Sequence, residues 1–257
     1  MIPSPTITAW SRTAPWATRA QIEQDLLLSR LIIDIAHHPY LGQELVFRGG
    51  TCLHKLHLHP ARRYSEDLDY VRTSPGGISE LTHTLSELGR ALGMDVTTRI
   101  GVHPKVYFRS VAEDGTRLRV KVEVNTHERS PAVPLVQLPF AVESSWYTAS
   151  ADVNTFHPTE LIATKIRALY QRKKGRDLFD LWLALTELKL DSNAILAAFG
   201  PYRPEGLTRK TAEANLRAKL DDPDFRDDLT LLVTTWPDGY DLTTAADLVI
   251  TTLHARL

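Results

Sequence analysis

Apolar residues in the first third of the chain alternate between helical and extended spacing. Ile22, Leu26 and Ile33 recur at helical spacing between about residues 18 and 38, and Pro39 follows as a stop signal. The pattern then predicts a strand, a helix, a strand and a helix in the segments ELVF, TCLHKLHL, DLDYVR and residues 78–92. This order of elements predicts a mixed α/β arrangement.

A β-hairpin is predicted next, because the alternating runs VYFRSVA and RLRVKVEV are separated by the turn residues Asp114 and Gly115. Side chains of a strand point alternately to its two faces. One face of the second run is therefore continuous valine: Val120, Val122 and Val124. The opposite face is polar: Lys121, Glu123 and Asn125.

The second half of the chain is predicted to be helical. Three prolines between Ser130 and Pro139 predict an irregular connection. Beyond Pro158 the helical pattern covers residues near 159–173, 177–188, 207–220 and 241–255. We place a domain boundary near residue 155, and we predict an α+β fold with a mixed α/β domain over residues 1–155 and a helical domain over residues 156–257.

Composition narrows the function classes. Hydrophobic residues at 43% and charged residues at 24% are typical of a soluble globular protein, and no apolar run approaches the roughly 20 residues of a membrane span, so we expect a cytoplasmic protein without a membrane partner. The single cysteine, Cys52, cannot form an internal disulfide. A net charge of -1 gives no global attraction for nucleic acid, so a nucleic-acid partner requires a local basic patch.

Two acids in the segment RYSEDLDY are candidates for metal binding. Asp67 and Asp69 lie two residues apart on a predicted strand, so they share a face with Cα atoms about 7 Å apart. A hard cation such as Mg²⁺ relieves the repulsion between such carboxylates, and Glu123 on the polar face of a later strand is the natural third ligand. The alternative interpretation is that both acids only decorate the exposed face of an edge strand.

The glycine pair before this strand suits phosphate binding. Gly49 and Gly50 lead from a predicted strand into a helix, so they offer bare main-chain amides at a helix N-terminus, and Thr51 adds a hydroxyl. A strand, a glycine turn, a helix and an Asp-x-Asp strand together are typical of a site for a metal-bound triphosphate.

The segment FRGGTCLHKLHLHPARRYSEDLDY resembles the signature of the AbiEii/AbiGii-type toxins, which belong to the DNA polymerase β-like nucleotidyltransferase superfamily. The segment ELIATKIRALYQRKKGRDLFDLW fits the same family. The resemblance implies a nucleotidyltransferase-like N-terminal domain with a small mixed sheet, and a helical domain that closes the nucleotide site. It further implies substrate contacts by the glycine turn and metal binding by three acids: Gly49, Gly50 and Thr51, then Asp67, Asp69 and Glu123.

Lys165 lies in the middle of the apolar stripe of its predicted helix, so it either extends along the helix to solvent or points into a polar pocket. The resemblance favours the pocket and implies that Lys165 reaches the nucleotide phosphates. It also places Arg176, Asp177 and Asp180 beside the nucleotide, although Asp177 can equally be an N-cap with Asp180 in the same capping arrangement. We expect the acidic run Asp221 to Asp228 to be a solvated helix terminus.

The sequence therefore predicts a metal-dependent nucleotidyltransferase that uses Mg²⁺ or Mn²⁺ and a nucleoside triphosphate. The resemblance implies a toxin with a cognate antitoxin, and an RNA acceptor, the 3′ end of tRNA, whose modification blocks translation. Phosphate contacts are expected from Arg62, Arg63 and Arg172 to Arg176. Ser65, two residues before Asp67, is a further substrate-site candidate, and its phosphorylation would place a competing dianion there.

Three alternatives remain open at this stage. A kinase could use the same metal-triphosphate geometry but transfer the γ-phosphate, and a nucleotidyltransferase could modify protein instead of RNA. A non-catalytic module that binds RNA or a partner protein is the third, and the intact Asp67 and Asp69 argue against it.

Overall fold

The computed structural model describes residues 2–257, which divide into two compact units. The first unit comprises the chain up to Pro131 together with Leu135–Phe156, and the second comprises Ala132–Pro134 and His157–Leu257. Among the described residues, no helix is long and apolar enough to cross a membrane.

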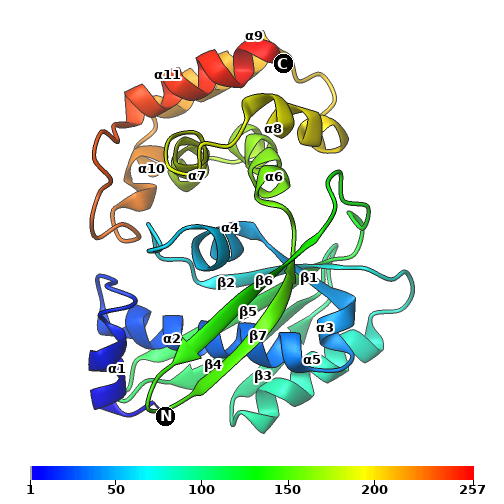
Figure 1. Ribbon diagram of the computed structural model, residues 1–257, viewed down its shortest axis with the longest axis vertical. Helices are drawn as coiled ribbons and strands as arrows, with labels where there is room; N and C mark the ends of the chain where they lie inside the picture. The colour runs from blue at the N-terminus through cyan, green and yellow to red at the C-terminus, as the bar shows by residue number, and fades with distance from the viewer. Residues whose placement is uncertain (1) are drawn as a thin grey trace. The chain divides into compact units, whose positions relative to one another are not determined.

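The first unit is built around one mixed sheet (Figure 1). Its helical elements are α1 (Ser4–Trp10), α2 (Arg19–His37), α3 (Leu41–Glu44), α4 (Gly49–Cys52), the π-helical turn η1 (Leu53–His57) and α5 (Ser79–Ala91). Its strands are β1 (Leu45–Arg48), β2 (Asp67–Arg72), β3 (Asp95–Arg99), β4 (Lys105–Val111), β5 (Arg117–Asn125), β6 (Val136–Glu143) and β7 (Thr148–Thr155).

Within residues 2–257 the seven strands follow the order β3-β4-β5-β2-β1-β7-β6. β2 pairs with β5 in parallel and β1 with β7 in parallel, whereas the remaining pairs are antiparallel. Helices α2 and α5 pack against one face, which is apolar because alternate strand residues point into it. The valine face predicted for β5 is part of this core, since Val120, Val122 and Val124 are at most 1% exposed.

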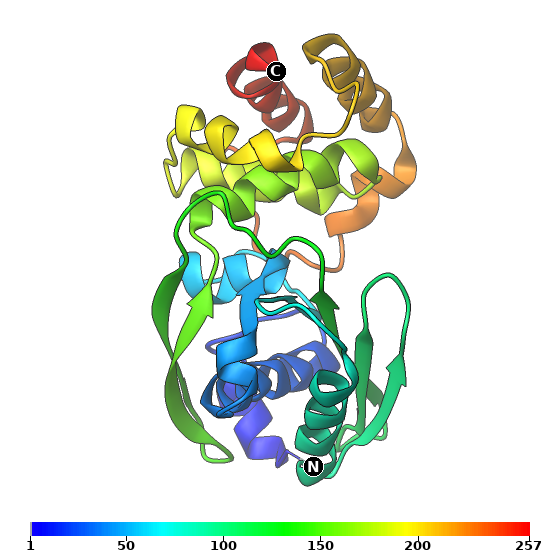
Figure 2. The ribbon, with the colours of Figure 1, turned by 90° about the vertical axis from the view of Figure 1, so that its right-hand side faces the viewer.

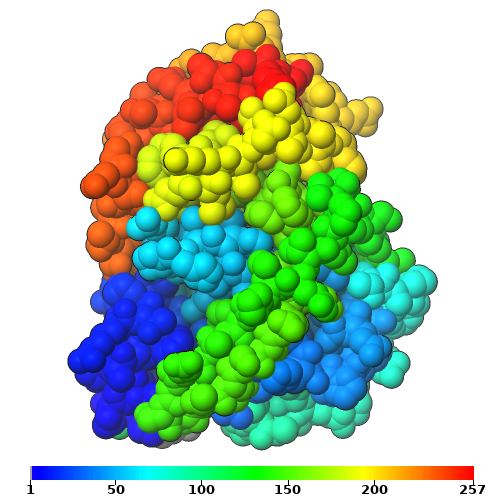
Figure 3. Space-filling model, viewed as in Figure 1, coloured from blue at the N-terminus to red at the C-terminus, as the bar shows by residue number. Residues whose placement is uncertain are grey.

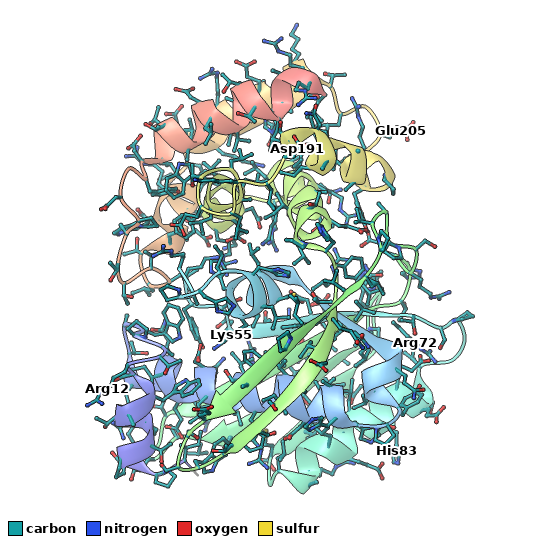
Figure 4. The ribbon with its side chains drawn as sticks, in the orientation of Figure 1. Arg12, Lys55, Arg72, His83, Asp191 and Glu205 are labelled. Atoms are coloured by element: carbon teal, nitrogen blue, oxygen red, sulfur yellow. The ribbon has the colours of Figure 1, made fainter. Side chains whose placement is uncertain are left out.

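Local signals explain where the main elements begin and end. Helix α2 starts at a capping box, in which the Thr18 hydroxyl accepts from the Gln21 amide and the Gln21 side chain accepts from the Thr18 amide. Arg72, at the end of β2, donates to Glu44 over 2.8 Å (Figure 4). The hairpin turn between β4 and β5 contains Gly115 at φ +85, a conformation that glycine adopts without strain.

Part of the predicted fold is incomplete, since the strands β3, β6 and β7 were not predicted. The irregular connection expected up to Pro139 ends earlier, because β6 begins at Val136 and pairs with β7, and neither strand was predicted. Pro139 has no N–H to donate. It is tolerated because β6 lies at the edge of the sheet and pairs with a neighbouring strand on one side only. Alternate residues of β6 are exposed, and the two strands run along the surface of the first unit in Figure 3.

The second unit is helical. Its elements are α6 (Pro158–Gln171), α7 (Gly175–Thr186), α8 (Ser192–Phe199), η2 (Gly200–Tyr202), α9 (Arg209–Leu220), α10 (Pro223–Arg226), η3 (Asp227–Leu229), α11 (Leu242–Thr252) and η4 (His254–Arg256). Helix α6 packs against α7 and α8, and α11 packs against α7. Buried Glu160 of α6 accepts the main-chain N–H groups of Ala132 and Val133 over 2.8 and 2.9 Å, so it binds the connecting segment to this unit.

Candidate active site

The glycine turn follows β1 directly, and its two glycines, which are the first residues of α4, are required by their surroundings. Gly49 has φ +84, and a Cβ there would lie 2.5 Å from a carboxylate oxygen of Asp69. A Cβ on Gly50 would collide with the guanidinium of Arg63. Only a residue without a side chain lets the turn approach the acids of β2 this closely.

Thr51 and Ser65 fasten the turn to the start of β2. The Thr51 hydroxyl lies 2.8 Å from the Ser65 hydroxyl and also bonds the main-chain carbonyl of Asp67. Thr51 is 2% exposed, whereas Ser65 is half-buried. The internal bonds of Thr51 hold the loop that precedes the acids, and its predicted triphosphate contact stays a prediction.

Asp67 and Asp69 point away from the core on β2, whose alternate residues Leu68 and Tyr70 are buried. The strand lies between β5 and β1, so the interpretation of these acids as decoration of an edge strand is wrong. In the register of the sheet, Asp69 lies opposite Glu123 of the parallel strand β5. The three acids predicted as metal ligands therefore come from neighbouring positions of one sheet face.

A lysine of the polar face of β5 lies among these acids, and the sequence pattern did not predict this contact. The Lys121 ammonium is 3.1 Å from Asp67 Oδ2 and 2.9 Å from Glu123 Oε2. Lys105 of β4 adds a second cation 3.5 Å from Glu123. Among residues 2–257, no group of three or more His, Cys, Asp or Glu side chains is arranged to hold a metal ion. The Lys121 ammonium instead lies between Asp67 and Glu123.

Burial and these lysines shift the pKa values of Asp69 and Glu123 in opposite directions. Burial raises the pKa of the Asp69 carboxyl, an effect that Lys121 opposes and the charges of Asp67 and Glu123 reinforce. Burial also acts to raise the pKa of Glu123, but hydrogen bonding and charge from Lys121 outweigh it, and the pKa falls below its usual value. Burial opposes the charge of Lys121, yet its bonds to the two acids raise its pKa.

This donor set fits a hard divalent cation. Carboxylate oxygens are the ligands that Mg²⁺ prefers, and the ammonium of Lys121 already marks a position between Asp67 and Glu123 where positive charge is stabilised. A metal ion at this position requires Lys121 to turn away.

The second unit contains a separate buried cluster around Lys165. Its ammonium lies 3.0 Å from Asp177 and 2.8 Å from Asp180, and both acids are fully buried. Arg172 donates to Asp177 over 2.6 and 2.8 Å. Lys165 therefore does not extend to solvent, and it points into a polar environment within this unit.

Two predictions for α7 are wrong. The residue before the helix is Lys174, which makes no side-chain cap, and Asp177 accepts bonds from Lys165 and Arg172 instead of capping the helix. Gly175 is the first residue of the helix, and a Cβ at this position would meet the carbonyl oxygen of Phe225. The capping interpretation of Asp177 and Asp180 therefore fails, since these side chains bind charged partners.

Two predictions for charged residues also need correction. Arg176 forms a two-pronged ion pair with Asp228, with both distances 2.8 Å, and the Asp228 side chain is only 3% exposed, so this end of the acidic run is not a solvated helix terminus. Arg63 is 2% exposed and donates to the Tyr64 carbonyl, so it cannot be a surface contact for RNA phosphates. The sequence pattern did not reveal the Arg176 pair because Asp228 lies 52 positions away, and the burial of Arg63 depends on its packing against Gly50.

Comparison with known proteins gives consistent matches. Residues 30–247 match a family model described as the nucleotidyl transferase AbiEii toxin of a type IV toxin–antitoxin system. The chain is similar to the solved structure of MenT4, a nucleotidyltransferase toxin from Mycobacterium tuberculosis, with 20% identity and a TM-score of 0.71 over 98% of this chain and 90% of that chain. This similarity shows a shared fold.

A second solved structure matches less well. It is an antigenic nucleotidyltransferase-like protein from Paracoccidioides brasiliensis, with 18% identity and a TM-score of 0.40 over 86% of this chain and 96% of that chain. No curated protein sequence matches.

Proposed function

Because the chain belongs to the AbiEii family of nucleotidyltransferase toxins, we propose that the glycine turn and the acids of β2 and β5 form its active site. The family assignment confirms the resemblance noted in the sequence and implies a nucleoside triphosphate substrate and an antitoxin partner. The observation that carries the proposal is the close approach of Gly49 to Asp69, which brings the glycine turn directly beside the acids.

Asp67, Asp69 and Glu123 would hold Mg²⁺ or Mn²⁺ through their carboxylate oxygens. Such a metal supplies positive charge against the triphosphate and lowers the pKa of a bound hydroxyl. The main-chain amides of Gly50 and Thr51 at the start of α4 suit the negative oxygens of the triphosphate. Ser65, whose hydroxyl contacts Thr51, would hold the loop that carries Asp67 in place.

The proposed reaction joins an acceptor hydroxyl to the α-phosphorus of the nucleotide and breaks the bond from that phosphorus to the oxygen that leaves with pyrophosphate. The proton of the hydroxyl passes to a carboxylate of the site.

The acceptor we propose is RNA, with the 3′ end of tRNA as the expected position and a block of translation as the consequence. The identity of the acceptor and the block of translation go beyond the family assignment. We also propose that Lys165 contacts the nucleotide phosphates, although its ammonium is bonded to Asp177 and Asp180 within its own unit. Asp177 and Asp180 would then hold Lys165 in place, while Arg176, paired with Asp228, would hold the start of α7.

The test incubates the protein with Mg²⁺, total tRNA and each nucleoside triphosphate, labelled at either the α- or the γ-phosphate. We expect α-label on RNA, and at least a 100-fold loss in an Asp67→Ala, Asp69→Ala double variant. Glu143→Ala, which removes an exposed acid of β6, is the matched control and should transfer normally. Label only from the γ-position would identify a kinase, and α-label on protein alone would replace RNA as the acceptor.

A further inference from the structure

The polar face of β3, β4 and β5 continues the face that carries the candidate active-site acids. In the register of the sheet, Asp67 lies opposite Lys121, and Lys121 lies opposite Tyr107. Adjacent strands are about 4.8 Å apart, so Tyr107 lies about 10 Å from Asp67 along one row of side chains. Any ligand on this part of the sheet therefore lies beside the acids.

This region, which we call the Tyr107 face, is strongly basic. Its members point away from the core on alternate positions of the three strands: Arg99, Lys105, Tyr107, Arg109, Arg117 and Arg119. The guanidinium groups of Arg99, Arg109 and Arg119 each lie 5.7 Å from the centre of the Tyr107 ring. Three cations therefore gather around one aromatic ring.

Most of this charge is uncompensated. Among the described residues, Arg99, Arg109, Arg117 and Arg119 form no ion pair, and Arg109 donates only to the Thr97 hydroxyl over 2.7 Å. Asp95 lies opposite Arg109 on β3 without bonding to it. Like charges held close together repel each other, so the arrangement is favourable when a polyanion neutralises it.

This face lies opposite the side of the sheet on which the helices α2 and α5 of the first unit pack. On that apolar side Val106, Phe108 and Val120 are at most 1% exposed. In Figure 2 the teal part of the chain, which contains β3 and β4, lies at the right-hand side of the first unit. The basic side chains are half-buried or exposed, so they are accessible to a ligand.

We propose that the Tyr107 face binds the single-stranded end of the RNA acceptor and leads its terminal hydroxyl to Asp67 and Asp69. The inference rests on the proposed function, which supplies the reason for an acceptor strand at this site. Arginines bind the phosphates, while Tyr107 and the arginine planes offer surfaces on which bases stack. The positive charge without paired acids favours a polyanion over a protein partner.

The test measures binding of a fluorescent single-stranded oligoribonucleotide by anisotropy at several salt concentrations, without nucleotide or metal. The triple variant Arg99→Gln, Arg109→Gln, Arg119→Gln should bind at least tenfold more weakly, and its salt dependence should decrease because fewer phosphates are neutralised. Tyr107→Ala should also weaken binding, whereas Tyr107→Phe should keep it.

The matched control removes the same charge elsewhere: Arg12→Gln, Arg90→Gln, Arg209→Gln, at exposed positions, of which Arg12 is labelled in Figure 4. Thermal melting verifies that each variant is folded. Unchanged binding in the first triple variant, or an equal loss in the control, would overturn the proposal.

A transfer assay separates this inference from the proposed function. If the protein transfers nucleotides, the triple variant should raise the KM for RNA and leave kcat unchanged. Binding through the Tyr107 face without any transfer would support this inference and refute the proposed function. Transfer with an unchanged KM in the triple variant would do the reverse.

Discussion

At the scale of single residues, Lys121 decides how the acids of the candidate site are arranged. Its ammonium bonds Asp67 and Glu123, so it neutralises two of the carboxylates that a metal would otherwise neutralise. Lysine and metal therefore compete for the same oxygens. The ammonium allows Asp67 and Glu123 to lie close together without a metal, and in the described part of the chain no group of side chains is arranged to bind one.

We predict that Lys121→Met increases the affinity for Mn²⁺ by about tenfold, equivalent to about 1.4 kcal/mol, because the metal no longer displaces an ammonium. Without metal the variant should be slightly less stable, since the partly exposed pairs contribute at most about 1 kcal/mol. Thermal melting across a Mn²⁺ titration measures both effects. Lys210→Met, at an exposed position of α9, is the control. Equal or weaker Mn²⁺ binding by Lys121→Met would show that the lysine does not compete.

At the scale of elements, the strand β5 and the helices α6 and α7, which pack against each other, each combine core packing with placement of charged side chains. The valines of β5 fill the core while Lys121 and Glu123 line the candidate site. Helices α6 and α7 bury Lys165 together with Asp177 and Asp180 among their apolar residues. A buried charged cluster is costly unless all its members are present.

Lys165→Met should therefore lower the unfolding free energy by about 3–5 kcal/mol, because it leaves buried carboxylates without their cation. The double variant Lys165→Met, Asp180→Asn should recover part of this loss, since one of the two charges is removed and Arg172 still holds Asp177. Chemical denaturation measures stability, and the transfer assay is then applied to the folded double variant. A loss of about 100-fold in transfer supports phosphate contact by Lys165, whereas full transfer makes the residue purely structural.

At the scale of the whole molecule, the pH dependence of stability depends on buried ion pairs such as Arg176 and Asp228. Burial acts to raise the pKa of Asp228, but hydrogen bonds from Arg176 outweigh it, and the pKa in the folded protein is lowered. The carboxylate therefore stabilises the fold above its unfolded pKa of about 4 and loses this effect as the pH falls through the folded value.

Asp228→Asn should lower the unfolding free energy by about 2 kcal/mol at pH 7, because a charged acceptor is lost from a buried site. The difference from the natural protein should begin to shrink below about pH 4, where the carboxyl of the unfolded chain takes up a proton, and should vanish as the pH falls through the lowered pKa of the folded protein. Denaturant unfolding between pH 7 and pH 3 measures this difference. Asp238→Asn, at an exposed position, should have little effect at any pH. A constant difference across this range would contradict the assigned role of the carboxylate.

Local patterns determined much of this protein. The helical spacing before His38, the Asp114-Gly115 turn and the alternation along β5 depend on neighbours in the chain, and the elements predicted from them are confirmed. The strands β6 and β7 were missed, because Pro139 and weakly apolar residues give no clear period and the edge position that tolerates them is a property of the whole sheet.

The sequence alone also suggested the glycine turn, the Asp-x-Asp pair and Glu123 as one chemical group, since turn and strand chemistry are local. Tertiary structure alone decided which charges meet. Lys121 joins Asp67 through strand register, Arg176 meets Asp228 across 52 positions of sequence, and Arg63 is buried against Gly50. An ion pair between residues far apart in the chain forms only when the fold brings them together. Local periodicity of the sequence does not predict such contacts.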